Sequence, residues 1–197
     1  MKLYIIPGAC SLAVNIALRE AGLRFELARL DLETGKADGV SFRSINPKGY
    51  VPALQLNDGR VLTENVAVLQ YVADQNPEVR LAPPAGSFER YRLMEWLCFI
   101  NSELHKGFSP LYSPLASEDV RQYARNHVGK RLDYLQETVT ESYLLGGRFT
   151  VADAYLFTVL GWGAEVGLEM AKWPRLEAYR AQIALRPHVV AALESEA

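Results

Sequence analysis

Hydrophobic and polar positions in the first half of the chain switch between strand-like runs and helical spacing. Residues 3–6 form a short apolar run that Pro7-Gly8 ends, which predicts a buried strand. From Ser11 the apolar residues recur every three or four positions, and Gly22 follows, so we expect a helix ending there. Residues 25–30 alternate apolar with polar side chains and predict a second strand.

The next segment predicts a hairpin followed by a helix. A polar stretch covers residues 31–39, and a short helical segment then ends at residues 46–49. Residues 53–56 and 61–62 are apolar runs joined by Asn57-Asp58-Gly59, and Asp-Gly between such runs is a strong hairpin signal. We expect Thr63 to cap the following helix. The order β-α-β-α-β-β-α is typical of a thioredoxin-like domain.

The second half is predicted to be entirely helical. Prolines and a glycine gather in residues 76–87, and beyond them apolar residues step by three and four without a convincing strand. Later helices are expected from about Val151, about Leu176 and Pro187. We predict an α/β N-terminal thioredoxin-like domain over residues 1–78, a linker over 79–86, and an all-α C-terminal helical bundle domain over 87–197.

Composition excludes several classes of partner. The 197 residues carry a net charge of −2 with no run of like charges, which argues against nucleic acid and anionic membranes. No apolar stretch is long enough to span a membrane, and the N-terminus does not resemble a signal peptide. The two cysteines lack metal-ligand spacing, so we expect no metal, no disulfide framework and a cytoplasmic location.

Cys10 is the first candidate for chemistry. It lies where the first strand, a tight turn and a helix meet, so free N–H groups and the helix dipole are expected to lower its thiol pKa. Ser11 would donate to the sulfur anion as well. The alternative is that Cys10 is a small buried residue. Ala13 stands where a dithiol motif needs its second cysteine, so a dithiol mechanism is not expected.

Val51 and Pro52 form the second candidate element. A cis Val51–Pro52 bond would turn the N–H and C=O of Val51 outward, where they can bind a peptide backbone as a strand does. The alternative is an ordinary trans turn, which is the commoner X–Pro geometry. The proline opens the third strand of a thioredoxin-like order, and this position favours the cis form.

Glu64 and Asn65 begin a predicted helix and form the third candidate element. Unpaired N–H groups there attract an anion, and the Glu64 carboxylate attracts a cation, which together suit an amino acid. The alternative is that Glu64 only complements the helix dipole. The three elements together suggest a ligand with a thiol, a peptide backbone and a free amino-acid end, and glutathione has all three.

Two helical patterns in the second half complete the set. Cys98, Ser102, His105 and Ser109 share one polar stripe, which would line a cleft facing the first domain or, alternatively, lie on a solvated face. Thr150 and Asp153 are spaced as a capping box, which is a stability element with no catalytic role.

The chain resembles the bacterial beta-class glutathione transferases over essentially its whole length. The resemblance is carried by the segments MKLYIIPGACSLAVNIALREAGL, NPKGYVPALQLNDG, LTENVAVLQYVAD, ELHKGFSPLY and GGRFTVADAYLFTVL. It implies the glutathione transferase fold, a homodimer and glutathione as co-substrate.

The resemblance also implies roles for individual residues. Cys10 would lie beside the glutathione sulfur and form a mixed disulfide with it. The other implied contacts are Val51 for the cysteinyl backbone, Glu64 and Asn65 for the γ-glutamyl end, and His105 and Lys106 from the first long helix of the second domain.

Four positions depart from the family pattern. Many members have Lys at Gly35, where it helps to hold the glycyl carboxylate; the neighbouring Lys36 takes over this role, or the contact is lost. Cys98 stands where relatives often carry Asn near the sulfur. Asn15 and Asn65 replace a frequent His and a frequent Ser or Gly.

We therefore expect an enzyme that presents the glutathione thiolate to small hydrophobic electrophiles, in an apolar pocket that includes Tyr112 and Trp162. Glutathione-dependent reduction of disulfides or peroxides through Cys10 is a further candidate activity. Two alternatives stay open: a reductase that uses Cys10 covalently, and a glutathione-binding stress or carrier protein with little catalysis.

Overall fold

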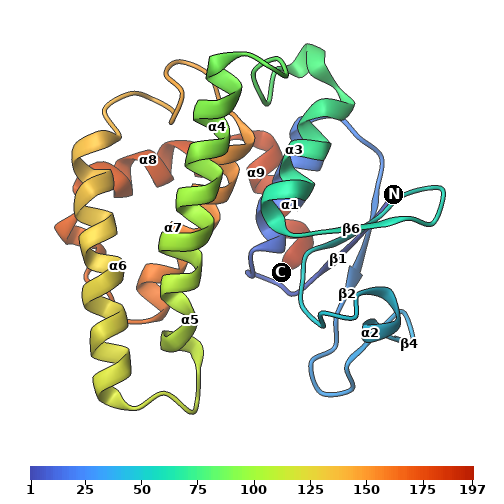
Figure 1. The fold of residues 1–197 in the computed structure, drawn as a ribbon, viewed down its shortest axis with the longest axis horizontal. Helices are drawn as coiled ribbons and strands as arrows, with labels where there is room; N and C mark the ends of the chain where they lie inside the picture. Colours follow the sequence, from blue (N-terminus) through green and yellow to red (C-terminus); the bar gives the residue numbers. More distant parts are fainter.

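A computed structural model describes all of residues 1–197, and it places an α/β half beside a helical half (Figure 1). The α/β half is built on a four-stranded sheet in the order β2-β1-β5-β6. β1 is parallel to β2, and the other neighbours are antiparallel. The strands are β1 Lys2–Ile5, β2 Glu26–Arg29, β5 Ala53–Gln55 and β6 Val61–Thr63.

Both faces of the central strand β1 are covered, which explains its continuous apolar run. Leu3 and Ile5 belong to the main core, together with α1 (Ser11–Glu20) and α3 (Asn65–Gln75). Tyr4 points the other way, into a small core that includes Phe42 of α2 (Phe42–Ile45). The period of two along a strand therefore divides β1 between two hydrophobic clusters.

Two local features of this half differ from what the sequence indicated. The polar stretch at 31–39 contributes to a two-stranded hairpin of β3 (Lys36–Ala37) and β4 (Val40–Ser41), which the sequence did not predict. Strands of two residues are too short to create an alternating pattern. Thr63 does not cap α3, because it stays in β6 paired with Ala53, and Glu64 is the N-cap instead.

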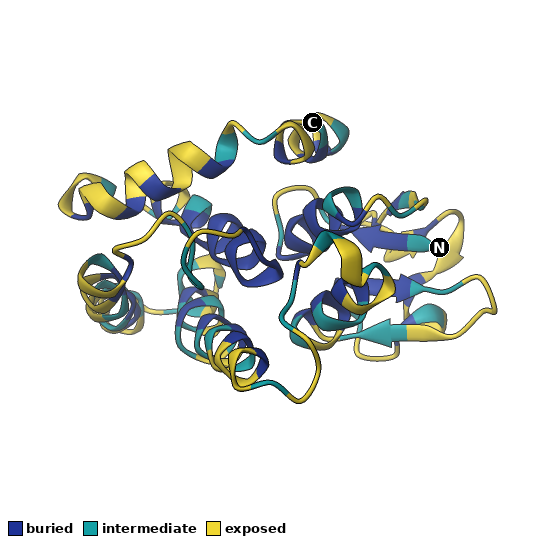
Figure 2. Cartoon of the chain, turned by 90° about the horizontal axis from the view of Figure 1, so that it is seen from above, coloured by how far each residue is buried: buried dark blue, intermediate teal, exposed yellow.

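The helical half surrounds a central helix, α7, which is buried along most of its length. Figure 2 shows that buried residues lie on the facing sides of the helices and exposed residues outside. None of the helices combines the length and the apolar composition that a membrane span requires. The elements are the short turn Pro77–Val79, α4 Phe88–Phe99, a π-helical segment Ile100–His105, α5 Lys106–Tyr112, α6 Glu118–Thr138, α7 Val151–Glu165, the short turn Met170–Lys172, α8 Pro174–Ala184 and α9 Pro187–Glu196.

The two halves share one hydrophobic core. Helix α1 packs against α3 within its own half and also against α7 and α9 of the helical half. A single cluster of 41 buried residues runs through both halves, whereas the small core around Tyr4 and Phe42 belongs to the α/β half alone. The fold class is the predicted one, whereas the boundaries at 78, 79–86 and 87 stay a prediction.

The predicted capping box at the start of α7 is confirmed. The buried Asp153 carboxylate accepts from the Thr150 N–H at 2.7 Å and the Thr150 hydroxyl at 2.8 Å. It also accepts from the Leu144 N–H at 2.8 Å and the Tyr179 hydroxyl at 2.6 Å. One side chain therefore joins the start of α7 to the preceding loop and to α8.

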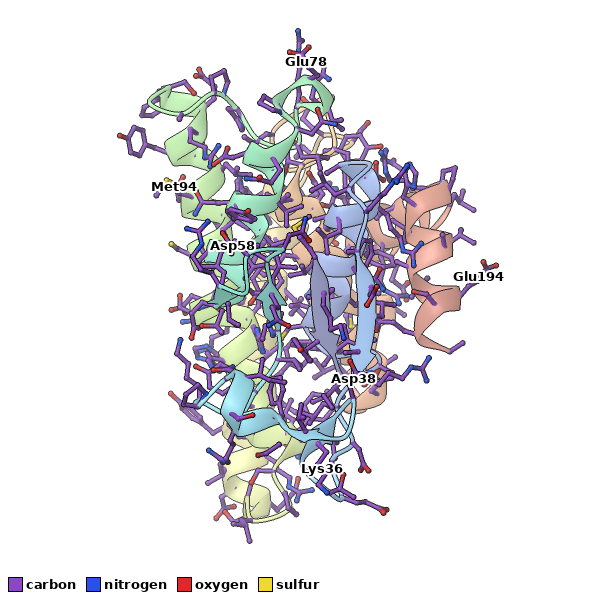
Figure 3. All side chains as sticks on the ribbon, turned by 90° about the vertical axis from the view of Figure 1, so that its right-hand side faces the viewer. Lys36, Asp38, Asp58, Glu78, Met94 and Glu194 are labelled. Atoms are coloured by element: carbon purple, nitrogen blue, oxygen red, sulfur yellow. The ribbon has the colours of Figure 1, made fainter.

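We expect Asp153→Ala to lower the free energy of unfolding by roughly 3 kcal/mol, because it leaves several buried donors without an acceptor. Denaturant titration followed by circular dichroism measures this loss. Glu194→Ala is the control, since Glu194 lies on the outer face of α9 (Figure 3) and should change stability by less than about 0.5 kcal/mol. Equal effects of the two substitutions would contradict the assigned role of Asp153.

Candidate active site

A cavity of about 510 Å³ lies at the junction of the two halves. The loop before α1 and the turn before β5 form one side of it, and α5, the end of the π-helical segment and α7 form the other. Its lining residues are Ile6, Pro7, Gly8, Ala9, Cys10, Tyr50, Val51, His105, Phe108, Ser109, Tyr112, Trp162 and Glu165.

Cys10 is the N-cap residue of α1, as the sequence predicts, and it is buried. Its Sγ donates a hydrogen bond to the Val51 carbonyl oxygen at 3.4 Å. Burial raises the pKa of the thiol to about 12, against the opposing effects of the Cys10 and Ser11 N–H groups and the Lys106 charge. The prediction of a lowered thiol pKa is therefore wrong for the free protein, because desolvation outweighs the helix terminus.

The Ser11 side chain does not serve the sulfur. Its hydroxyl donates to the Ile6 carbonyl at 3.3 Å and faces the Ile6 N–H at 3.4 Å, and the residue is fully buried. Ser11 therefore stabilises the loop that carries Cys10, and the expected bond from Ser11 to a sulfur anion is not formed. The competing acceptor is a backbone carbonyl only five residues earlier.

The Val51–Pro52 peptide bond is cis, as predicted. The Val51 carbonyl accepts from Cys10, whereas the Val51 N–H makes no hydrogen bond within the protein. Because Val51 lines the cavity, this unpaired donor is available to a ligand. Pro52 itself is not among the lining residues.

Glu64 occupies the start of α3 with φ of 71°, in the left-handed region that favours glycine. Its carboxylate already accepts hydrogen bonds from Lys48 and from the Tyr50 hydroxyl at 2.9 Å. The Lys48 bond holds the pKa of Glu64 below its usual range, and Tyr50 contributes to the shift. A ligand ammonium group would therefore share the Glu64 carboxylate with Lys48 and Tyr50, two donors that the sequence pattern did not identify.

Asn65 lies directly behind Cys10. Its amide nitrogen donates to the Cys10 carbonyl at 3.1 Å, and its Oδ1 is buried without a hydrogen-bond partner. The side chain thus supports the cysteine from inside the protein, while the first N–H groups of α3 remain free to bind an anion. These open donors and the unpaired Val51 N–H fit a ligand with a carboxylate and a peptide backbone.

His105 is held in the cavity by a chain of polar contacts. Its Nδ1 lies 2.7 Å from the Tyr155 hydroxyl, which donates to Asn101 Oδ1 at 3.0 Å. With the Tyr155 proton directed to Asn101, Nδ1–H donates to Tyr155, and this tautomer leaves Nε2 as an acceptor. Burial lowers the pKa of His105 to about 4, with a smaller contribution from Lys106, so the ring is uncharged at neutral pH.

The predicted polar stripe is broken at the π-helical segment. His105 and Ser109 line the cavity, whereas Cys98 and Ser102 are exposed and do not. A π-turn contains the equivalent of one additional residue and rotates the following helix by about 100°. A stripe predicted from regular 3.6-residue spacing therefore cannot keep the residues before the π-turn and those after it on one face of the helix.

The two predicted lysines lie outside the cavity. Lys106 stands over the Tyr50 ring, 5.8 Å from its centroid, and its charge acts on Cys10. Lys36 is exposed on the β3–β4 hairpin (Figure 3) and no contact links it to the other predicted residues. Its contact with the ligand stays a prediction.

Two residues of the helical half, Trp162 and Glu196, fix the loop before Cys10. The sequence pattern did not predict this role for either of them. The Trp162 indole donates to the Gly8 carbonyl at 2.9 Å, and Glu196 of α9 accepts from the Gly8 N–H at 3.0 Å. Asn15 donates to the same Glu196 carboxylate at 2.9 Å, which accounts for a polar side chain inside α1. Separations above 150 residues leave no local signal for these contacts.

The cavity can hold a thiol ligand without a metal. Cys10 offers a sulfur and Val51 a backbone donor, and His105 offers an uncharged nitrogen acceptor beside them. No group of three or more His, Cys, Asp or Glu side chains in the structure could hold a metal ion. The arrangement suits sulfur nucleophile chemistry on a peptide-like ligand.

Comparison with known proteins gives one consistent result. Family profiles described as Glutathione S-transferase, N-terminal domain, and Glutathione S-transferase, C-terminal domain, match residues 1–74 and 96–187. Glutathione S-transferase GstA of Escherichia coli O157:H7 is 46% identical over 100% of the chain and 98% of its own length.

Solved structures agree with this result. A sphingomonad glutathione S-transferase complexed with glutathione is 49% identical, with a TM-score of 0.96 over 100% of this chain and 98% of its own. A bacterial beta-class glutathione S-transferase of Sphingomonas chungbukensis gives the same identity, TM-score and coverage.

The raised pKa of Cys10 predicts slow alkylation. With limiting iodoacetamide at neutral pH we expect exposed Cys98 to react first, because buried Cys10 is almost entirely protonated. In a Cys98→Ser variant, the alkylation rate of Cys10 should still be rising with pH well above neutrality. Peptide mapping by mass spectrometry measures both. A Cys10 rate that is already constant near neutral pH would contradict the burial argument.

Proposed function

The chain belongs to the glutathione S-transferase family as a bacterial beta-class member, and we propose that the cavity at Cys10 is where it joins glutathione to small hydrophobic electrophiles. It is an enzyme of the glutathione S-transferase type, with glutathione as its co-substrate. One observation carries the assignment of the site: the Cys10 sulfur, the unpaired Val51 N–H and the uncharged His105 ring meet in one cavity.

We propose that the α/β half holds glutathione. The Val51 N–H and C=O, set by the Val51–Pro52 bond, would bind the cysteinyl backbone. Glu64, Asn65 and the start of α3 would bind the γ-glutamyl end. Lys106 would add attraction for an anionic ligand, and Lys36 is our candidate for the glycyl carboxylate. The support for these roles is the free N–H groups and the charges described above.

His105 is the proposed proton acceptor. Its Nε2 would accept a hydrogen bond from the thiol of glutathione and take the proton as the sulfur bonds to the electrophilic carbon. In a substitution, the leaving group departs with the electron pair of its bond to that carbon. In an addition, the π electron pair of the electrophile shifts to the neighbouring atom instead. The lowered pKa of His105 keeps the ring uncharged, so Nε2 is open to the hydrogen bond from the thiol. It also makes the ring a weak base, so the proton moves only as the bond from sulfur to carbon forms and then passes on to solvent.

The apolar wall of the cavity supplies the proposed electrophile site. Phe108, Tyr112 and Trp162 face one another with ring centroids 5.7 Å and 6.3 Å apart for the two pairs that include Trp162. Aromatic edges and faces of this kind bind flat apolar molecules.

The raised pKa of Cys10 favours conjugation by glutathione over a route in which Cys10 attacks first, since little Cys10 thiolate exists near neutral pH. A disulfide or peroxide reductase activity through Cys10 is therefore a second candidate. It would need the mixed disulfide between Cys10 and glutathione to form. Family membership argues against the alternative of a carrier with little catalysis.

We also propose a homodimer in the cytoplasm. Phe88 and Tyr91 are exposed on α4 and give a second copy an apolar surface to cover. Both cysteines are free, which suits a reducing compartment.

Cys10→Ala should abolish mixed-disulfide formation. After incubation with oxidised glutathione at mildly alkaline pH, the original protein should gain one glutathionyl group, with one glutathione thiolate released. The Cys10→Ala variant should gain no glutathionyl group in this cavity. Conjugation should survive at least partly, because His105 and the start of α1 remain. Intact-mass analysis with peptide mapping tests this, and a mixed disulfide on Cys98 alone would overturn the assignment of Cys10.

His105→Ala should lower kcat by roughly 10- to 100-fold, because it removes the positioned proton acceptor while the binding groups remain. The KM for glutathione should change less. Steady-state kinetics with glutathione and a neutral aryl halide measures both constants.

Lys106→Ala is the matched control on the neighbouring residue. It should act mainly on KM through charge, and its effect should shrink as salt is added. An unchanged kcat in His105→Ala would show that the ring takes no part in the chemical step. A rise in KM alone would make His105 a binding residue.

A further inference from the structure

The end of the cavity that lies away from the Cys10 loop carries one carboxylate. Glu165 and Tyr112 both line the cavity, and the Tyr112 hydroxyl donates to Glu165 Oε2 at 2.8 Å. The remaining lining side chains carry no charge. They are apolar residues, glycine, serine, the protonated Cys10 and Tyr50, and the uncharged His105. Glu165 is therefore the one charged side chain in contact with the space where an electrophile would sit.

No basic side chain pairs with this carboxylate. Glu165 takes part in no salt bridge, and the nearby acid Glu169 forms its own pair with Lys172 at 2.9 Å. Arg121 is engaged by the carbonyls of Ser113 and Ala116, and it does not line the cavity. Lys106 acts at the opposite end, beside Tyr50 and Cys10.

Backbone dipoles add to the negative potential at this end. α7 ends at Glu165, and the continuous helical stretch through α5 ends at Tyr112, so two helix C-termini meet there. An acid in the last turn of a helix opposes the dipole, and α7 has no basic residue there to compensate. The other end of the cavity contains the N-terminus of α1, so the cavity is polarised along its length.

We propose that Glu165, held in place by Tyr112, is a specificity-determining residue that favours neutral or cationic electrophiles and disfavours those bearing a carboxylate. This inference rests on the proposed function and names the substrate class within it. A cationic or hydrogen-bond-donating group of the electrophile would meet Glu165, while its reactive carbon faces the sulfur. A carboxylate in the same position would meet an unneutralised negative charge.

The effect has a definite expected size. Glu165 is exposed to solvent, so water screens its charge, and the interaction with a ligand charge a few ångströms away corresponds to about a fivefold to tenfold change in kcat/KM. Added salt should reduce the discrimination, since the carboxylate lies at the mouth of the cavity.

Three aryl chlorides with one reactive centre test the proposal: 4-chloro-3-nitrobenzamide, 4-chloro-3-nitrobenzoate, and the N-(2-aminoethyl) amide, which carries a cation. Glu165→Gln keeps an acceptor for Tyr112 and removes the charge. For each protein, kcat/KM with glutathione is measured and expressed relative to the benzamide. In Glu165→Gln the benzoate-to-benzamide ratio should rise at least about fivefold, and the ratio for the cationic amide should fall.

Glu169→Gln, which removes a nearby exposed charge outside the cavity, should leave both ratios unchanged. Ratios that do not move in Glu165→Gln, or that move equally in Glu169→Gln, would overturn the proposal. Failure of the original protein to conjugate any of the three compounds would instead contradict the proposed function, so the two failures are distinguishable.

Discussion

Burial of the N-terminal end of α1 between the two halves is the constraint on which the site depends. The sheet and α3 cover α1 from one half, and α7 and α9 cover it from the other. The loop in front of it is bonded through Gly8 to Trp162 and Glu196, and through Ile6 to Ser11. Cys10 is therefore presented to the cavity by a segment whose backbone is held from both halves.

This burial reverses the expected chemistry of the sulfur. A helix N-terminus stabilises a thiolate, and Cys10 does occupy that position, yet removal from water acts more strongly and raises the thiol pKa. A protonated Cys10 bonded to the Val51 carbonyl leaves the role of nucleophile to glutathione. Desolvation also keeps the His105 ring uncharged. At neutral pH, therefore, Cys10 carries no negative charge that would repel a glutathione thiolate, and His105 carries no positive charge that would attract it.

The remaining charges then decide how the cavity is polarised. Lys48 and Lys106 lie on the side of the proposed glutathione site, with Glu64 partly neutralised by Lys48. Glu165 stands at the other end, at a helix C-terminus, without a basic partner. A ligand with a negative end and a neutral or positive end matches this distribution better than one that is negative throughout.

The sequence by itself determined the order of the four sheet strands and the main helices, the capping box at Thr150 and Asp153, and the segments that meet at the site. These features follow from turn residues, hydrophobic periodicity and short motifs, which act over a few neighbouring residues. The cis bond before Pro52 was predicted from the place of that proline in the order of elements. Tertiary structure alone decided the direction of the Cys10 pKa shift, the partner of Ser11, the Asn101–Tyr155–His105 chain and the pairing of Tyr112 with Glu165. Each of these depends on burial, on the rotation introduced by one π-turn, or on a contact formed by packing, and local sequence patterns carry no signal for them.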